Sequence, residues 1–504
     1  MSEALEGVPL PLPPPRPVDA GVVVLFRRAP DGVEVFWLKR EKALRFAGGF
    51  HAFPGGRVDA GDSAVKVARA PGPAPLVVAA ARELFEETGV LKAQGAAALG
   101  QAKLDELRRA LLDQTLTFSS LLESHGLSID AADFPSAGRW VTPPWFPMRF
   151  DTRFFLVEAP TGQVAQVWRG ELESGEWVAP LAGLSRWRLG TALLHPPNLH
   201  VLKVMARFGG VERACEELAR PDGLADDCVP TSFEFQEGVV GVPVRTPTLP
   251  PATHTNVLFL GTGELLIVDP GSPDDGEIRR LLAHVQKLEG RRATAIVLTH
   301  HHADHVGGAA QLSRALGVPV WAHEATAARL NLEVGRLIGE GDVLALDGPL
   351  PMRWRVLHTP GHTRGHLTLV DEGSRAAVVG DMVSGLGTVV IDPPEGDMAE
   401  YVRQLERLKG EVRTLYPAHG PVVPDGVAKL DEYLAHRRWR EERVIEALAS
   451  MGRPAALSEL LPLAYDDVAA FVLPLAQRSA HAILEKLKGE GRARLEGERW
   501  TRVD

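Results

Sequence analysis

The chain has 504 residues and a formal net charge of −10 at neutral pH; 45% of its residues are hydrophobic and 24% are charged. This length exceeds what one hydrophobic core supports, so we expect two to four domains of ordinary globular composition. The charge excludes a global basic surface for nucleic acid, and no apolar run approaches the roughly 20 residues that span a bilayer, so we expect no membrane partner.

The N-terminal residues and the cysteines indicate the cellular compartment. Residues 1–17 are acidic and then proline-rich, which predicts a disordered leader and not a secretory signal. Cys215 and Cys228 are too few for a disulfide framework and match no zinc spacing. We therefore expect a reducing, cytoplasmic location.

The first predicted elements are a hairpin and a helix. Apolar runs at 21–28 and 33–40 flank the turn-forming residues 29–32, which predicts paired strands. Val78 to Thr88 predicts a helix that ends at Gly89.

This helix carries three carboxylates on one face. Glu83, Glu86 and Glu87 stand at i, i+3 and i+4. They repel one another unless a cation lies between them, and oxygen ligands favour Mg²⁺ or Mn²⁺. Arg82 is placed to pair with them and to fix their orientation.

Gly55-Gly56, followed later by Arg82-Glu83-Leu84-Phe85-Glu86-Glu87-Thr88-Gly89-Val90, resembles the Nudix box. The resemblance implies an α/β/α sandwich over residues 18–230, with Glu83, Glu86 and Glu87 as metal ligands and Glu86 and Glu87 also catalytic. Asp62 stands where the box has its first glutamate, and residues 63–81 number nineteen where the family has seven. We expect the extra residues to form a surface loop ahead of the helix.

The neighbouring sequence is similar to one branch of that family, the coenzyme A diphosphatases. The similarity lies in Leu38-Lys39-Arg40-Glu41, Leu44-Arg45, Phe53-Pro54-Gly55-Gly56 and residues 149–155. It implies a nucleotide or coenzyme A derivative as substrate, contacted by Arg40, Arg45, Gly55 and Gly56. The alternatives are a solvated acidic helix, or a nucleotide sensor without turnover.

The second half has a different organisation. Residues 221–251 are rich in proline, glycine and aspartate, which places a domain boundary near residue 230. Short apolar strands then alternate with helices as far as residue 425, an α/β pattern. The expected strands are 257–259, 265–268, 295–298 and 376–379, and the expected helices are 275–288 and 307–316.

Metal-type side chains follow several of these strands. Four of them occur close together in Thr299-His300-His301-His302-Ala303-Asp304-His305, and single ones occur at His362, Asp381 and His419. Imidazole and carboxylate ligands without cysteine suit zinc, with manganese or iron as alternatives.

These motifs resemble the metallo-β-lactamase superfamily, whose fold is an αββα sandwich, over residues 231–425. The resemblance implies two zinc ions; Asp304 is the catalytic residue and Asp269 orients the ligand loop, whereas His301 and His366 match no ligand position. Two cations lower the pKa of a shared water toward about 7 and polarise the scissile oxygen. The implied ligands are His300, His302 and His362 for one ion, Asp304, His305 and His419 for the other, and Asp381 for both.

Residues 426–504 predict three helices and a hairpin around 496–498, the pattern of a winged helix. This arrangement after such a domain is similar to the mitochondrial β-lactamase-like endoribonuclease and its bacterial relatives, which cut single-stranded RNA. Acids balance the bases in this segment, so a domain that only shields or orients the active site is the alternative. The candidate phosphate contacts are Arg478, His481, Lys486, Lys488, Arg492 and Arg494.

The sequence therefore predicts a dinuclear zinc hydrolase joined to a Mg²⁺-dependent Nudix hydrolase of nucleoside diphosphate derivatives. Thioester hydrolysis is one alternative for the second half, because residues 360–363 with Gly365-His366 also look like glyoxalase II. Cleavage of single-stranded RNA, with the first half as a nucleotide sensor, is another.

Overall fold

The computed structural model describes residues 15–503 except 31, 43–47, 71, 73, 145, 147, 169, 209, 221–229, 470 and 471. Most of the predicted leader, Arg45 and Cys228 lie outside the described residues. The chain divides into two compact units, with the division between Glu237 and Gly238. None of the described helices is both long and apolar enough to cross a membrane.

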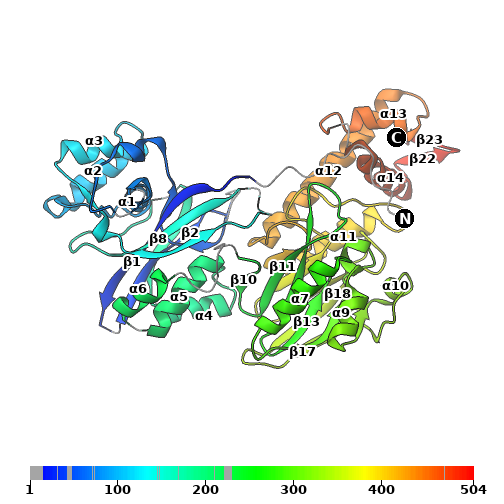
Figure 1. Cartoon of the computed structure of the whole chain (residues 1–504). Helices are drawn as coiled ribbons and strands as arrows, with labels where there is room; N and C mark the ends of the chain where they lie inside the picture. Colours follow the sequence, from blue (N-terminus) through cyan, green and yellow to red (C-terminus); the bar gives the residue numbers. More distant parts are fainter. Residues whose placement is uncertain are drawn as a thin grey trace. The chain divides into compact units, whose positions relative to one another are not determined.

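The first unit is built on a mixed sheet (Figure 1). The predicted hairpin is present, since β1 (Val18–Ala29) pairs antiparallel with β2 (Gly32–Arg40). β1 also pairs in parallel with β8 (Phe150–Glu158). The other strands of this sheet are β3 (His51–Ala52), β4 (Gly55–Arg57), β7 (Ser136–Val141) and β9 (Leu172–Val178), and β5 (Val67–Ala68) and β6 (Ile129–Asp130) form a separate pair.

Helices cover both faces of this sheet because successive side chains of a strand point to opposite sides. Val23 and Leu25 belong to the core on the side of α1, whereas Val24 and Phe26 belong to the other core. The result is the expected three-layer α/β/α arrangement. The helices of the first layer are α1 (Ala74–Thr88), α2 (Gln101–Leu112) and α3 (Phe118–Ser124), and those of the second are α4 (Pro180–Arg188), α5 (Pro196–Phe208) and α6 (Val211–Ala219).

The predicted surface loop ahead of the carboxylate helix is only partly correct. α1 begins at Ala74, whereas the predicted helix begins at Val78, so residues 74–77 belong to the helix instead of a loop. Apolar side chains in this first part of α1, including Leu76 and Val78, are buried against β1. A Cβ at Gly21 would lie 2.5 Å from the Leu76 carbonyl oxygen, so the helix packs tightly on the strand. The preceding residues form η1 (Ala60–Ala64) and β5.

The second unit contains two sheets flanked by helices, the expected αββα arrangement (Figure 1). α7 (Asp275–Lys287) and α9 (Ala309–Leu316) flank the first sheet, and α11 (Met398–Lys409) packs on the second. The strands of the first sheet include β11 (Val239–Arg245), β12 (His254–Leu260), β13 (Glu264–Val268), β14 (Arg292–Val297), β15 (Val320–Ala322) and β16 (Arg336–Leu337). Those of the second are β17 (Val343–Leu346), β18 (Met352–His358), β19 (Leu367–Asp371), β20 (Ala376–Gly380) and β21 (Thr414–Pro417).

The C-terminal part has the predicted winged-helix elements: α12 (Gly426–Met451), α13 (Leu457–Ala464), α14 (Leu473–Gly489), β22 (Ala493–Glu496) and β23 (Arg499–Arg502). Its core is continuous with that of the second sheet. One hydrophobic cluster joins Val379 and Tyr401 to Leu434, Leu484 and Trp500. The winged helix and the αββα sandwich therefore form one compact unit.

Candidate functional site

The predicted metal ligands of the second unit all lie just beyond strand ends, in loops or a short helix. His300 and His302 follow β14, and Asp304 and His305 lie in α8 (Ala303–Val306). The structure brings them together with the three distant ligands, in two clusters whose ligand atoms lie within 4.8 Å of one another. One cluster is His300, His302, His362 and Asp381, and the other is Asp304, His305 and His419.

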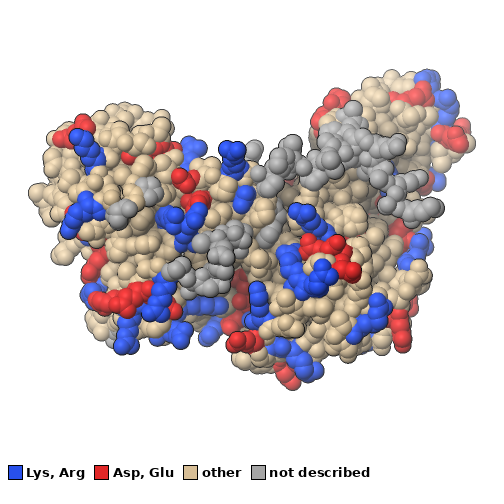
Figure 2. Space-filling model, viewed as in Figure 1, with Lys and Arg blue, Asp and Glu red and all other residues tan. Residues whose placement is uncertain are grey.

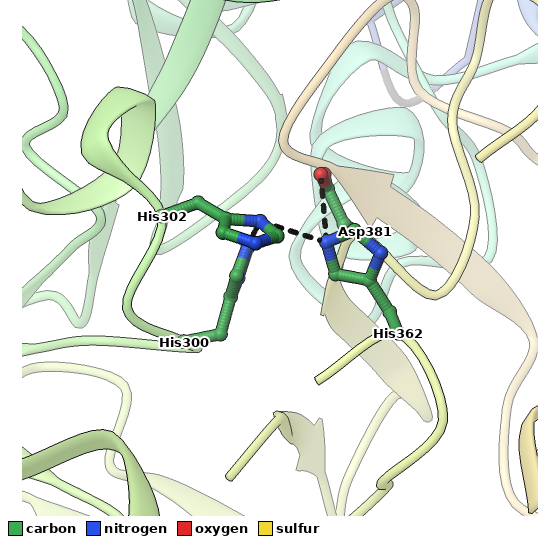
Figure 3. Close-up of side chains that lie close together, drawn as sticks. All are labelled: His300, His302, His362 and Asp381. Atoms are coloured by element: carbon green, nitrogen blue, oxygen red, sulfur yellow. Dashed lines mark hydrogen bonds and ion pairs between the residues drawn. The ribbon is translucent and has the colours of Figure 1, made fainter. Parts of the chain in front are cut away.

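The first cluster is drawn in Figure 3, where three imidazoles and a carboxylate point toward one another. Nε2 of His300 lies 2.9 Å from Nδ1 of His302, and Nε2 of His362 lies 3.0 Å from the same atom. Nitrogen ligands at about 2.0–2.1 Å from a tetrahedral zinc ion are about 3.3 Å apart. This spacing therefore fits donors that surround one ion.

Asp381 lies between the two clusters. Its Oδ2 is 3.5 Å from Nε2 of His362, on the side of the first cluster. Its Oδ1 is 3.5 Å from Nε2 of both His305 and His419, on the side of the second. One carboxylate thus offers an oxygen to each cluster, which is the geometry a bridging ligand requires.

In three of the histidines, the ring nitrogen that faces away from the centre forms a hydrogen bond, which fixes the orientation of the ring. Nδ1 of His362 donates to the Val390 carbonyl oxygen at 2.9 Å, and Nδ1 of His419 donates to the His254 carbonyl oxygen at 3.0 Å. Nδ1 of His305 donates to Oδ2 of Asp269 at 2.8 Å. The Nε2 atoms of these three histidines are therefore left as ligand atoms facing the centre.

The chemistry of the donor set fits metal ions. Nε2 of His305 and Oδ1 of Asp381 are buried and, among the described residues, have no hydrogen-bond partner. Leaving buried polar atoms unpaired is costly, and a cation between them removes that cost. Five imidazoles and two carboxylates without a thiolate suit zinc.

The pKa shifts of His300 and Asp381 also fit metal binding. Burial holds the pKa of His300 well below its usual value, so its ring is neutral and ready to bind metal. Burial opposes ionisation of Asp381, but His419 and His305 hold its pKa well below the usual range. The carboxylate of Asp381 is therefore ionised.

Asp269 lies where the predicted orienting role requires it, behind the ligand loop. Its carboxylate accepts hydrogen bonds from the backbone N–H of Thr299 at 2.8 Å and from the Thr299 hydroxyl at 2.6 Å, in addition to the one from His305. It thereby fixes the start of the ligand loop.

Replacing Asp269 with asparagine is expected to weaken metal binding by about 10–100-fold, the usual cost of losing such an outer partner. The asparagine keeps the size but cannot accept from three donors with the same charge. Competition with a chromophoric chelator measures the affinity, and Asp275→Asn, an exposed carboxylate in α7, is the control. Unchanged affinity would contradict the orienting role.

Two supporting residues were not identified from the sequence. His366 is fully buried, and its Nε2 accepts the backbone N–H of Asp381 at 3.1 Å. Asn256 donates from Nδ2 to the carbonyl oxygens of Pro417 and Gly420, on either side of His419. The motif Gly365-His366 contained a signal for the first; the second depends on strand pairing that local sequence does not reveal.

In the first unit, Arg82 lies at the centre of the carboxylate cluster. Its guanidinium donates to Glu83 at 2.9 Å and to Glu86 at 3.0 Å, as predicted. It also binds Asp62 through two nitrogens, at 2.9 and 3.1 Å. Asp62, at the position of the missing glutamate, is thus the buried partner that fixes Arg82.

We expect Asp62→Ala to destabilise the first unit by about 3–5 kcal/mol, because it leaves the buried Arg82 without its bidentate partner. The side chains of Asp62 and Arg82 are only 2% and 9% exposed. Chemical denaturation followed by tryptophan fluorescence measures the change. Asp59→Ala, at a 49% exposed carboxylate 3.8 Å from Arg82, is the control and should have a much smaller effect.

Two glycines allow β4 to approach the carboxylate helix closely. Glu87 accepts the backbone N–H of Gly55 at 2.9 Å, and a Cβ at Gly56 would lie 2.3 Å from the carboxylate of Glu83. Burial raises the pKa of Glu87 to about 8 and that of Glu86 to about 7, with Glu83 adding to both. Such crowded carboxylates fit a site that a divalent cation completes.

A cavity of about 450 Å³ adjoins this cluster. Glu83, Glu87 and the predicted substrate residues Arg40, Gly55 and Gly56 line it; the prediction for Arg45 falls outside the described residues. Nε of Arg40 is buried and, among the described residues, has no hydrogen-bond partner. The aromatic part of the wall consists of Phe53, Trp140, Phe146, Phe150, Phe154, His195 and, from β10 (Phe233–Gln236), Phe233 and Phe235.

The six candidate phosphate contacts of the winged helix are each paired with an acid. Lys486 and Arg492 each lie 2.6 Å from Glu441, and Arg478 lies 3.3 Å from Asp392. In the view of Figure 2, acidic and basic side chains alternate over this part of the molecule. The remaining pairs are His481 and Lys488 with Glu485, and Arg494 with Glu496.

The fold and the His/Asp cluster define a metal-dependent hydrolase. Residues 250–419 match the sequence model of the Metallo-beta-lactamase superfamily, and residues 457–500 match that of the Beta-lactamase associated winged helix domain. A "Beta-lactamase-like protein 2 homolog" from Caenorhabditis elegans is 30% identical over 243 residues, which cover 47% of this chain and 79% of the relative. The chain belongs to the metallo-β-lactamase superfamily.

Two further comparisons cover parts of the chain. A hydroxyacylglutathione hydrolase from Xylella fastidiosa is 42% identical over 152 residues, which cover 30% of this chain and 52% of the relative. The crystal structure of a NUDIX hydrolase from Alicyclobacillus acidocaldarius is 30% identical, with a TM-score of 0.35, and the match covers 40% of this chain and 96% of that one. The Nudix resemblance of the first unit therefore depends on the residues of that unit and not on this comparison.

Proposed function

We propose that the second unit is a dinuclear zinc hydrolase that cleaves thioesters. The observation that carries the proposal is Asp381, whose two oxygens face the two ligand clusters. His300, His302 and His362 would hold one ion, and Asp304, His305 and His419 the other. When bound, the ions supply Lewis acidity for the scissile carbonyl and lower the pKa of water at the site.

The chain's own residues orient this chemistry. Asp269, Val390 and His254 accept hydrogen bonds from the Nδ1 atoms, so the Nε2 atoms of His305, His362 and His419 are directed inward. Asp304 is held through its carbonyl oxygen by the Thr255 hydroxyl at 2.8 Å, and its Oδ2 lies 3.4 Å from His419. Asp304 is therefore placed to bind the second ion and to accept a proton at the reacting centre.

The thioester assignment draws on chemistry shared with one relative. A hydroxyacylglutathione is a thioester, and the relative named for its hydrolysis matches 152 residues of this chain. RNA cleavage is the competing assignment, and the ion pairs of the winged helix count against it, because phosphate binding would have to break them.

For the first unit we propose Mg²⁺-dependent hydrolysis of a nucleoside diphosphate derivative. The cluster of Glu83, Glu86 and Glu87 beside a 450 Å³ cavity supports this proposal, since these carboxylates suit a hard cation next to a diphosphate. Arg40, whose buried Nε has no hydrogen-bond partner among the described residues, is placed to bind the substrate.

One substrate tests both proposals. An acyl-coenzyme A contains a thioester and a diphosphate, and the purified chain with Zn²⁺ and Mg²⁺ should release free coenzyme A from the first bond. Cleavage of the second should give 3′,5′-ADP and an acyl-phosphopantetheine, all identified by mass spectrometry. An intact substrate would refute coenzyme A for both units, and single-stranded RNA would then be tested.

A further inference from the structure

We infer that helix α12, the first helix of the winged-helix part, supports the metal centre through two buried side chains, Tyr433 and Arg437. Both hold the loop of residues 382–391, which follows the bridging ligand Asp381. The inference rests on the proposed dinuclear centre and assigns its positioning residues outside the ligand motifs.

The loop contacts ligands of both clusters. It begins directly after Asp381, and its Val390 carbonyl oxygen accepts Nδ1 of His362 at 2.9 Å. The backbone N–H of Gly385 donates to the carbonyl oxygen of His419 at 2.7 Å. A shift of this loop therefore moves three of the seven proposed ligands together.

Tyr433 holds the middle of the loop. Its side chain is buried, and its hydroxyl accepts the backbone N–H of Ser384 at 2.9 Å. The same hydroxyl is within donating distance of the carbonyl oxygens of Ser384 and Gly387, at 3.1 and 3.0 Å. One phenol thus satisfies backbone groups on both sides of the bend.

Arg437 lies one helical turn further along and holds the end of the loop. It is 5% exposed, and its Nη2 donates to the carbonyl oxygen of Val389, the neighbour of the residue that receives His362. Its guanidinium also lies over the ring of Tyr401, 5.1 Å from the centroid. Among the described residues no carboxylate forms an ion pair with Arg437. The contacts of its buried guanidinium are therefore the Val389 carbonyl oxygen and the Tyr401 ring.

Tyr401 completes the support from a second helix. It is fully buried in α11, and its hydroxyl donates to the carbonyl oxygen of Met382 at 2.7 Å, next to Asp381. Arg437 packs on the ring of this tyrosine, so α12 acts on both ends of the loop. The winged helix therefore does more than cover the sandwich: its first helix fixes the geometry of the ligands.

The test compares Tyr433→Phe and Arg437→Met with Arg438→Met in the full-length chain. Arg438 is the next residue on the helix, is exposed, and bonds only to its own helix at Leu434 among the described residues. The affinity for Zn²⁺ is measured by competition with a chromophoric chelator, and the melting temperature of the metal-free protein is measured in parallel. We expect about tenfold weaker zinc binding for Tyr433→Phe and Arg437→Met and wild-type affinity for Arg438→Met.

The outcomes separate this inference from the proposed centre. If the wild type binds two ions and Tyr433→Phe, which keeps the ring, binds them equally tightly, the supporting role is refuted. A variant with a lower metal-free melting temperature but unchanged zinc affinity refutes it as well, since the residue is then only structural. If the wild type itself fails to bind two ions, the dinuclear centre is wrong and the inference falls with it.

Discussion

Asp381→Asn is expected to reduce hydrolysis by the second unit more than 100-fold. Loss of a residue that only hydrogen-bonds to a metal ligand typically costs roughly 10–100-fold. Its two oxygens face different clusters, and the amide nitrogen that replaces one of them cannot accept or bind a cation. The zinc content per chain should fall from two toward one. Metal analysis and the rate of thioester cleavage measure the two effects.

Asp392→Asn is the matched control, because this carboxylate lies just past the loop, is 49% exposed and pairs only with Arg478 among the described side chains. It should retain both ions and full activity. Asp381→Asn with two tightly bound ions would contradict the bridging role.

Glu87→Gln is expected to lower diphosphate cleavage by the first unit by about 10²–10⁴-fold, the range for removal of a catalytic acid or base. Burial raises the pKa of this carboxyl to about 8, and it faces the cavity. Glutamine keeps the size and can still accept the Gly55 N–H, so the helix should stay folded. Release of 3′,5′-ADP measures the effect.

The reciprocal variant separates the two sites. Asp304→Ala should abolish thioester cleavage and leave diphosphate cleavage unchanged, whereas Glu87→Gln should do the reverse. If each variant reduces both activities equally, the two reactions do not have independent sites. If neither activity responds to its own variant, the two-site proposal is wrong.

The sequence predicted what depends on local spacing. Glu83, Glu86 and Glu87 share a face because helical periodicity requires it, and the strand-end histidines converge because an α/β sandwich exposes such positions. The predicted surface loop ahead of the helix was wrong for Ala74 to Val77, because α1 begins at Ala74 instead of Val78 and its apolar side chains pack on β1. Periodicity alone did not show where that helix began.

Contacts between distant segments could not be predicted. Three hydrogen bonds join residues 15 or more positions apart: Arg82 to Asp62, Asp381 to His366, and Ser384 to Tyr433. Tyr433 and Arg437 lie in a helix that the sequence assigned to a separate domain. Their role depends on tertiary packing, which residue patterns within one element do not encode.

The hydrophobic cluster that joins Val379 and Tyr401 to Leu484 and Trp500 has a consequence for how the molecule unfolds. Elements that share one core lose their packing together, so the sandwich and the winged helix should melt in a single cooperative transition. The first unit has cores of its own. A substitution that creates a cavity at Trp500, in the terminal hairpin, should therefore destabilise the whole second unit, including the sheet that carries Asp381.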